Sequence, residues 1–266
     1  SLAAGHMPSV VFIPDIEPGT ALNHLIPRCN SIATTTDKTI SFLPKNKPVE
    51  ITGYPIRPSF KGWTKTKGKK ELNLHAHKPV LLVFGGSKGS RSINRTLQSI
   101  LPDLLKEAQV IHITGKDNWD ENREASSGLP NELIGDYHPF SFLHAHQMGA
   151  AFASADLAVC RAGASTLGEL PFFKLPAILV PYPHAWRYQY TNAEYLVHHG
   201  GALLLKDQEL PEKLQPTITS LLHDPMRLTA MADAMHKLSH PDAAQKIGDL
   251  IISASKKKGG TTTWSV

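Results

Sequence analysis

Short apolar runs alternate with longer amphipathic segments from residue 79 onward, and this alternation predicts strands and helices in turn. Pro79–Phe84 is a continuous apolar run, typical of a strand buried on both faces of a parallel sheet. The repeating strand–helix order predicts an α/β domain with a doubly wound parallel sheet. Further strands are expected at 110–114, 133–134, 158–160, 178–180 and 202–205, and helices at 92–106, 147–154, 212–222, 225–238 and 243–256.

The first part of the chain has a different pattern. Residues 1–58 contain short β-like runs at 10–13, 31–34, 39–42 and 49–52, with Pro and Gly between them. So few strands with so little helix cannot bury both faces of a sheet, so we expect 1–58 to be the remnant of a truncated α/β domain. Residues 59–77 have linker composition, rich in Lys, Thr and Gly. A complete domain is expected at 78–258, followed by a flexible tail at 259–266.

Composition narrows the class of protein. The chain has 266 residues, of which 41% are hydrophobic and 19% charged, as in globular domains. A net charge of +5 suits an anionic substrate or membrane surface, and equally a solvated basic face. Two cysteines without metal or redox spacing fit a reducing compartment, and the His-x-His pairs lack a third ligand, so no metal is expected. Because no apolar run is long enough to span a bilayer, any membrane contact would be peripheral.

The segment from Ala155 to Ala193 carries the most functional information. It reads as strand, small-residue loop, helix, strand, polar loop and helix. Two consecutive strand ends would then direct polar groups and a helix N-terminus into one crevice. Open α/β sheets bind ligands at such crevices, and a bare helix start favours an anion such as a diphosphate.

A glycine-rich turn follows the first strand of the complete domain. Gly85-Gly86-Ser87-Lys88-Gly89 precedes a helix, so its backbone can turn tightly and offer N–H groups to a phosphate. It is neither a Walker A motif nor the dinucleotide fingerprint. A tight strand-to-helix turn without a ligand remains the alternative.

Four polar side chains have two interpretations each. Glu169 either accepts two hydrogen bonds from a ribose diol or forms a capping box with Thr166. Gln189 and Asn192 share one helix face, which suits sugar hydroxyls or simply solvent. Arg57 stands between prolines, where its guanidinium either reaches a diphosphate or lies unpaired at the surface.

Three blocks of the sequence carry a family resemblance: Gly85–Asn94, Ala155–Glu169 and Pro181–Ala193. Together they resemble the MurG family of bacterial glycosyltransferases, which are UDP-N-acetylglucosamine:undecaprenyl-diphospho-muramoylpentapeptide N-acetylglucosaminyltransferases. Gly53–Arg57 also resembles the Gly-Asn-Pro-Val/Ile-Arg motif at the family's domain junction. The resemblance spans nearly the whole chain and is most specific from Pro79 to Ala193. It implies a GT-B fold in which the C-terminal domain holds most of the UDP-sugar.

The resemblance also implies roles for individual residues. Ser87 and the backbone of Gly163, Ala164, Ser165 and Thr166 would contact the diphosphate, Glu169 the ribose, Arg57 the phosphates, and Gln189 and Asn192 the sugar hydroxyls. Uracil would lie near Met148. Gly86 and Gly89 would complete the glycine-rich turn, and Asp15 would lie on the acceptor side.

The function so implied is inverting transfer of GlcNAc from UDP-GlcNAc to lipid I, giving lipid II in peptidoglycan synthesis. The partners would be UDP-GlcNAc, the lipid-linked muramoyl-peptide acceptor and the cytoplasmic face of the cell membrane, with no cofactor, metal or nucleic acid. Departures from the family pattern are Tyr188 beside Gln189, where two glutamines are common, and Phe12–Asp15 in place of His-Glu-Gln-Asn.

The family's N-terminal glycine-rich loop, which carries the histidine proposed as general base, is missing from this sequence. We therefore expect no catalytic base among these residues and negligible turnover by this chain alone. Two alternatives stay open: a related GT-B transferase with another lipid acceptor, and a non-catalytic protein that binds a nucleotide-sugar.

Overall fold

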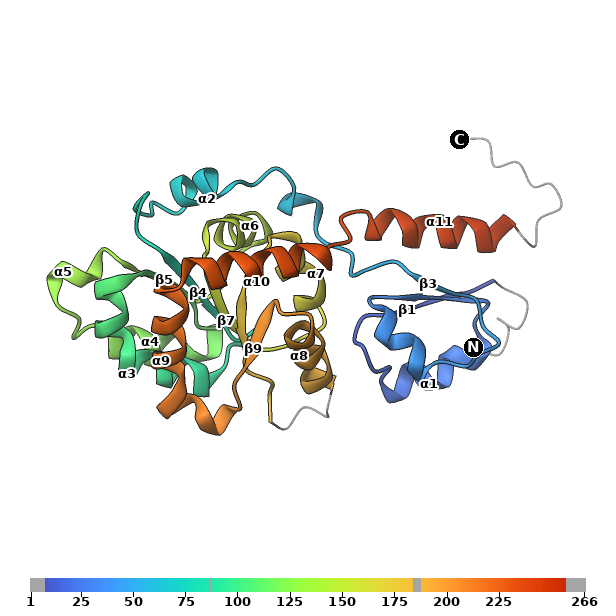
Figure 1. Cartoon of the computed structure of the whole chain (residues 1–266), viewed down its shortest axis with the longest axis horizontal. Coiled ribbons are helices and arrows are strands. Elements are labelled where there is room, and N and C mark those ends of the chain that lie inside the picture. Colours follow the sequence, from blue (N-terminus) through green and yellow to red (C-terminus); the bar gives the residue numbers. More distant parts are fainter. Residues whose placement is uncertain (1–7, 87, 184–187, 257–266) are drawn as a thin grey trace. The chain divides into compact units, whose positions relative to one another are not determined.

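The computed structural model describes residues 8–86, 88–183 and 188–256, whose contacts form two compact units (Figure 1). The first unit combines the described residues up to Ile56 with those from His240 onward, and the second is Arg57–Ser239. These limits differ from the expected domains 1–58 and 78–258, because α11 (Ala243–Lys256) packs on strands of the first unit. A helix's periodicity shows that it has an apolar face, but not which sheet covers that face.

The first unit contains a parallel sheet of order β1-β2-β3, formed by Val10–Ile13, Ser31–Thr34 and Val49–Ile51. The connections contain α1 (Thr20–Leu25), η2 (Ile26–Arg28) and η3 (Asp37–Phe42). Three of the four predicted strands are confirmed. The strand predicted at 39–42 is wrong: the segment forms the 3-10 helix η3, in which Thr39 is buried while Ile40 and Phe42 are exposed.

The second unit contains a six-stranded parallel sheet of order β6-β5-β4-β7-β8-β9, as the repeating strand–helix pattern predicts. The strands are Tyr137–Phe140, Gln109–Ile113, Val80–Phe84, Leu157–Cys160, Ala177–Leu179 and Ala202–Leu204. From β4 the chain proceeds outward through β5 to β6, and then returns to β7 on the other side of β4. The strand order therefore reverses between β4 and β7.

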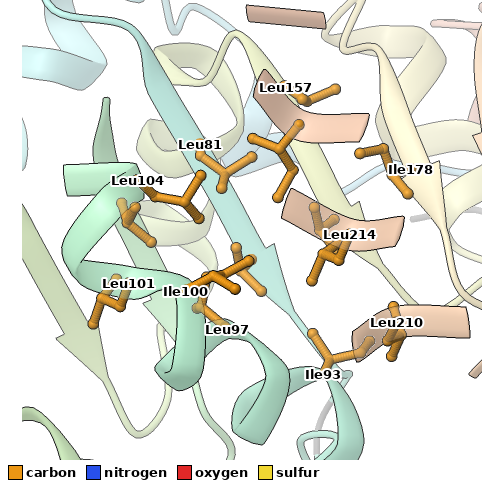
Figure 2. Close-up of a cluster of buried hydrophobic side chains, with 14 of the residues drawn as sticks. Leu81, Ile93, Leu97, Ile100, Leu101, Leu104, Leu157, Ile178, Leu210 and Leu214 are labelled. Atoms are coloured by element: carbon orange, nitrogen blue, oxygen red, sulfur yellow. The ribbon is translucent and has the colours of Figure 1, made fainter. Parts of the chain in front are cut away.

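Helices cover one face of this sheet through a continuous aliphatic core. α3 (Arg91–Glu107) and α9 (Leu210–Leu222) bury their apolar residues against alternate residues of the strands, including Leu81, Leu157 and Ile178 (Figure 2). α10 (Pro225–Lys237) packs on α9 and adds Met231 to this core. Alternate residues point to opposite faces of a strand, so Leu81 and Val83 serve this core while Leu82 and Phe84 serve the other face.

An aromatic cluster fills the opposite face. Phe84 and Phe173 pack around Phe152 of α6 (Ala145–Ser154), with ring centroids 5.6 and 5.3 Å from that ring. Phe60, in η4 (Pro58–Phe60), joins them and is 1% exposed. α2 (Lys65–Glu71) packs on α6. The segment 59–77, with its linker composition, is thus a packed part of the second unit.

The remaining elements are short or lie at the carboxyl ends of strands. They are η5 (Lys116–Asn118), α4 (Trp119–Ser126), α5 (Asn131–Ile134), α7 (Thr166–Phe172), α8 (Tyr188–His198) and η6 (Asp207–Glu209). The strand predicted at 133–134 is wrong, since α5 occupies it and β6 follows. β6 contains Pro139, which an edge strand tolerates because one side of it needs no hydrogen bond. No helix in 8–86, 88–183 or 188–256 has the length and hydropathy needed to cross a bilayer.

Candidate functional site

The candidate site lies at the carboxyl ends of β4 and β7, where the strand order reverses. Phe84 and Cys160, the last residues of these strands, are direct partners in the parallel register. The turns that follow, 85–89 and 161–165, therefore leave the sheet side by side. A crevice at such a reversal is where open α/β sheets bind ligands.

The glycine-rich turn after β4 is fixed by its own backbone. The N–H of Gly89 donates to the carbonyl of Gly86 at 2.9 Å, and both residues have positive φ, 76° and 87°. At Gly89 a side chain would begin 1.9 Å from the carbonyl oxygen of Thr114, whereas at Gly86 no non-adjacent described atom lies within 4 Å. The turn thus packs tightly at Gly89 and borders open space at Gly86. Ser87, the expected phosphate contact, lies outside the described residues.

The turn after β7 also borders open space. No non-adjacent atom of the described chain lies within 4 Å of a side chain begun at Gly163. The N–H groups of Gly163, Ala164 and Ser165 have no acceptor among the described residues. Three neighbouring N–H donors at a helix start are suited to an anion.

Thr166 does not cap the helix in the way that the sequence spacing allows. Its hydroxyl donates to the Gly163 carbonyl at 2.6 Å, and the N–H of Glu169 donates to the Ser165 carbonyl at 2.9 Å. Ser165 is the N-cap residue and makes no side-chain cap bond. The capping-box interpretation of Glu169 is therefore wrong, and its carboxylate is left for other partners.

Glu169 lies in the first turn of α7 and is 8% exposed. Burial raises the pKa of its carboxyl group, while a hydrogen bond from the Ser165 side chain and the positive charge of Arg57 oppose that rise. Arg57 itself is exposed, with its guanidinium 5.8 Å from the ring centroid of Phe60. The structure thus places Arg57 close enough to Glu169 for their charges to interact.

The side chains of Gln189 and Asn192 are hydrogen-bonded to backbone groups of neighbouring segments. The Oε1 atom of Gln189 accepts the N–H of Tyr182 at 2.9 Å. The side chain of Asn192 is 0% exposed, and its Nδ2 donates to the carbonyl of Ala162 at 3.1 Å. Asn192 therefore supports the turn before Gly163, and its contact with the sugar hydroxyls stays a prediction.

Two further predicted residues belong to other elements of the chain. Met148 lies in α6, half-buried, and its N–H donates to the carbonyl of His144. Asp15 follows β1 in the first unit and is also half-buried. Within 8–86, 88–183 and 188–256, no three His, Cys, Asp or Glu side chains gather as metal ligands would.

Arg161 is a residue to which the sequence assigned no role. Its guanidinium is buried directly after β7 and donates to Asp207 and Ser92, which lie 46 residues later and 69 residues earlier in the chain. A charged residue at the end of an otherwise apolar strand was the available signal, because buried charges require partners.

Comparisons with known proteins agree with this geometry. Residues 80–247 match the glycosyltransferase family 28 C-terminal domain. The chain is 36% identical, over 92% of its length, to a Roseiflexus sp. (strain RS-1) protein named UDP-N-acetylglucosamine–N-acetylmuramyl-(pentapeptide) pyrophosphoryl-undecaprenol N-acetylglucosamine transferase. It is 36% identical over 90% of its length to the protein of that name from Chlorobium limicola. It spans 64% of the length of each of these relatives.

Solved structures share the fold. The crystal structure of Acinetobacter baumannii MurG superposes with a TM-score of 0.72 at 24% identity, covering 95% of this chain and 69% of that one. A putative UDP-N-acetylglucosamine 2-epimerase from Listeria monocytogenes has a TM-score of 0.63 at 13% identity, covering 90% and 63%. The predicted GT-B type of α/β fold is confirmed. Because the match at residues 80–247 covers more than half of the sequence, this chain belongs to glycosyltransferase family 28.

Proposed function

We propose that this chain carries the donor-binding half of an inverting N-acetylglucosaminyltransferase. The intact enzyme transfers GlcNAc from UDP-GlcNAc to lipid I, the lipid-linked muramoyl-peptide acceptor, and yields lipid II for peptidoglycan synthesis. The names of the relatives, together with family membership, support this reaction. Because the acceptor is a membrane lipid, the reaction takes place at a membrane surface in this proposal, and we expect the enzyme to bind peripherally on the cytoplasmic face.

The pairing of Phe84 with Cys160 is the observation on which the proposal depends. It brings the 85–89 and 161–165 turns together at the reversal point of the sheet, and Gly86 and Gly163 both border open space there. A diphosphate seated between the turns receives the N–H groups of Gly163, Ala164 and Ser165. These donors lie where negative charge develops on the departing UDP, so they stabilise the transition state.

Glu169 and Arg57 complete the nucleotide contacts in this proposal. As a carboxylate, Glu169 accepts two hydrogen bonds from the ribose diol. Its buried charge is costly when unpaired, and the donors of the ribose offset part of that cost. The charge of Arg57 stabilises the ionised form of Glu169 and is also available to the phosphates.

The chemical step requires a base that removes the proton from the muramoyl 4-hydroxyl as its oxygen attacks the anomeric carbon, with inversion. In this proposal, none of the described residues at the site acts as that base. We therefore expect this chain to bind the donor and to turn it over negligibly.

Calorimetric titration with UDP, UDP-GlcNAc and ADP tests the proposal. We expect UDP and UDP-GlcNAc to bind and ADP to bind at least tenfold more weakly. Glu169→Gln should weaken binding of UDP at least tenfold, whereas Glu121→Gln, an exposed carboxylate paired with Arg95, should leave it unchanged. Absence of UDP binding at millimolar concentration, or equal affinity in Glu169→Gln, would contradict the assignment.

A further inference from the structure

The guanidinium of Arg161 is surrounded by acceptors. Its Nη1 atom donates to the carbonyls of Val180 and Pro181 at 3.1 and 3.3 Å and to Asp207 Oδ1 at 2.5 Å. Its Nη2 atom donates to Ser92 Oγ at 2.9 Å, and the side chain is 9% exposed. An arginine that binds an anionic ligand directly keeps part of its fork open to that ligand. Arg161 instead directs its fork into the protein.

Ser92 closes a triangle with Arg161 and Asp207. Its hydroxyl accepts from Arg161 Nη2 and donates to Asp207 Oδ1 at 2.8 Å. The hydroxyl donates its single proton to Asp207 and uses an oxygen lone pair to accept from Arg161, so one orientation of the group satisfies both bonds. The carboxylate of Asp207 also balances the buried positive charge. Three side chains from distant parts of the sequence thereby fix each other's positions.

The triangle joins the segments that border the candidate site. Ser92 lies in the first turn of α3, directly after the 85–89 turn, and Asp207 begins η6 after β9. Val180 and Pro181 begin the segment that leads from β8 to Gln189. The ring of Tyr182 lies over the guanidinium, 5.4 Å from its centre, and the Tyr182 N–H is the group that Gln189 accepts. One guanidinium thus couples the glycine-rich turn to the segment after β8.

We propose that Arg161 and Asp207 are positioning residues for the donor site. They set the spacing between α3, which follows the glycine-rich turn proposed to hold the diphosphate, and residues 180–182 after β8, without touching the ligand. This role rests on the proposed function. A lysine at 161 keeps the charge but lacks the fork that reaches Ser92, Asp207 and the two carbonyls together.

A second ion pair of comparable burial provides the matched control. Lys78 Nζ lies 2.5 Å from Asp136 Oδ2, and the two side chains are 24% and 13% exposed. Lys78 precedes β4 and Asp136 precedes β6, so this pair lies at the amino ends of the strands, opposite to the candidate site. Disrupting either pair should lower the unfolding temperature, but only the pair at the carboxyl ends should alter ligand binding.

The experiment measures thermal unfolding and calorimetric affinity for UDP and UDP-GlcNAc in Arg161→Lys, Asp207→Asn, Ser92→Ala and Lys78→Met. We expect the first three variants to weaken UDP-GlcNAc binding at least tenfold. They should also reduce the difference in affinity between UDP-GlcNAc and UDP. Lys78→Met should bind as the unaltered chain does despite its lower unfolding temperature. Ser92→Thr retains the hydroxyl and should recover most of the affinity lost in Ser92→Ala.

The outcomes separate this role from the proposed function. If the unaltered chain binds UDP-GlcNAc and the folded variants at 92, 161 and 207 bind it equally well, the positioning role is overturned and the donor site stands. If the unaltered chain and Lys78→Met both fail to bind UDP and UDP-GlcNAc, the proposed function fails, and the positioning role fails with it. Should Arg161→Lys not fold, Ser92→Ala and Asp207→Asn decide the question.

Discussion

The carboxyl group of Glu169 lies close enough to the thiol of Cys160 for its charge to act on that thiol. Burial, and after it the charge of Glu169, raises the pKa of Cys160. Burial likewise raises the pKa of Glu169, against the opposing effects of Ser165 and Arg57. Glu169, close to the end of β7, is therefore a carboxyl group whose charged form is disfavoured unless a partner donates hydrogen bonds to it.

Glu169 should make the free energy of unfolding depend on pH in a particular direction. Because the pKa of its carboxyl group is raised in the folded chain, the native state holds this proton more tightly than the unfolded state. The associated stability is fully present below the ordinary glutamate pKa and is lost as pH rises from that value to the raised one. Glu169→Gln should remove this loss.

Urea unfolding at a series of pH values from 4 to 8 measures the effect as the difference between the unaltered chain and Glu169→Gln. Removing the opposing charge with Arg57→Gln should raise the carboxyl pKa further and move the upper end of the window to higher pH. Parallel stability curves for the unaltered chain and Glu169→Gln would show that the carboxyl group does not titrate as described.

The two positive-φ glycines of the 85–89 turn should differ in their tolerance of a methyl group. Gly86→Ala has open space and should cost about 1–2 kcal/mol, the price of a left-handed conformation. Gly89→Ala should cost at least twice that, because its methyl group would begin 1.9 Å from the Thr114 carbonyl and the backbone must move. Chemical unfolding of both variants, with Gly128→Ala as the unstrained control, checks the order. Equal losses at 86 and 89 would contradict the tight packing of Gly89.

The sequence predicted the sheet of the second unit well because its strands are short apolar runs that need no partner to be recognised. The run 39–42 shows the limit of that reasoning. Its apolar and polar residues alternate as in a strand, yet the segment forms η3 after Thr36, and the Thr36 and Thr39 hydroxyls are hydrogen-bonded to each other. Alternation alone does not distinguish a strand from a turn stabilised by local side-chain bonds.

The site itself was predictable only in part. The turns after β4 and β7 were found because glycine and small residues mark them, and strand order brings them together. The burial of Asn192 could not be predicted, since an amide on a helix has the same sequence pattern whether it faces solvent or Ala162. Arg161 was missed for a similar reason: its partners Ser92 and Asp207 are adjacent only after folding.

Phe60 should behave as a core residue despite the polar segment around it. It is 1% exposed and packs against both Phe152 and Phe173, so Phe60→Ala should cost about 3–5 kcal/mol. Phe142→Ala is the matched control. That ring is 42% exposed and makes a cation–π contact with Lys116, so its loss should cost below about 1 kcal/mol. A small effect of Phe60→Ala in urea unfolding would mean that residues 58–60 do not pack on this unit.

His112 should make the second unit sensitive to acid. Gln98 donates to the hydroxyl of Tyr137, which leaves that hydroxyl to donate to His112 Nδ1 at 2.8 Å and His112 Nε2 to donate to Asn94 Oδ1 at 3.0 Å. The ring is fully buried in this neutral form, and burial lowers the pKa of His112 to about 3. The unfolded chain therefore binds this proton more readily, and stability is lost as pH falls from the ordinary histidine pKa toward 3.

His112→Gln should flatten that part of the stability curve at some cost at neutral pH, whereas the exposed His77→Gln should leave the curve unchanged. Tyr137→Phe should cost about 1–3 kcal/mol at neutral pH, because it leaves Nδ1 of a buried ring without a donor. An acid limb of the same slope in His112→Gln as in the unaltered chain would rule out this histidine as its source.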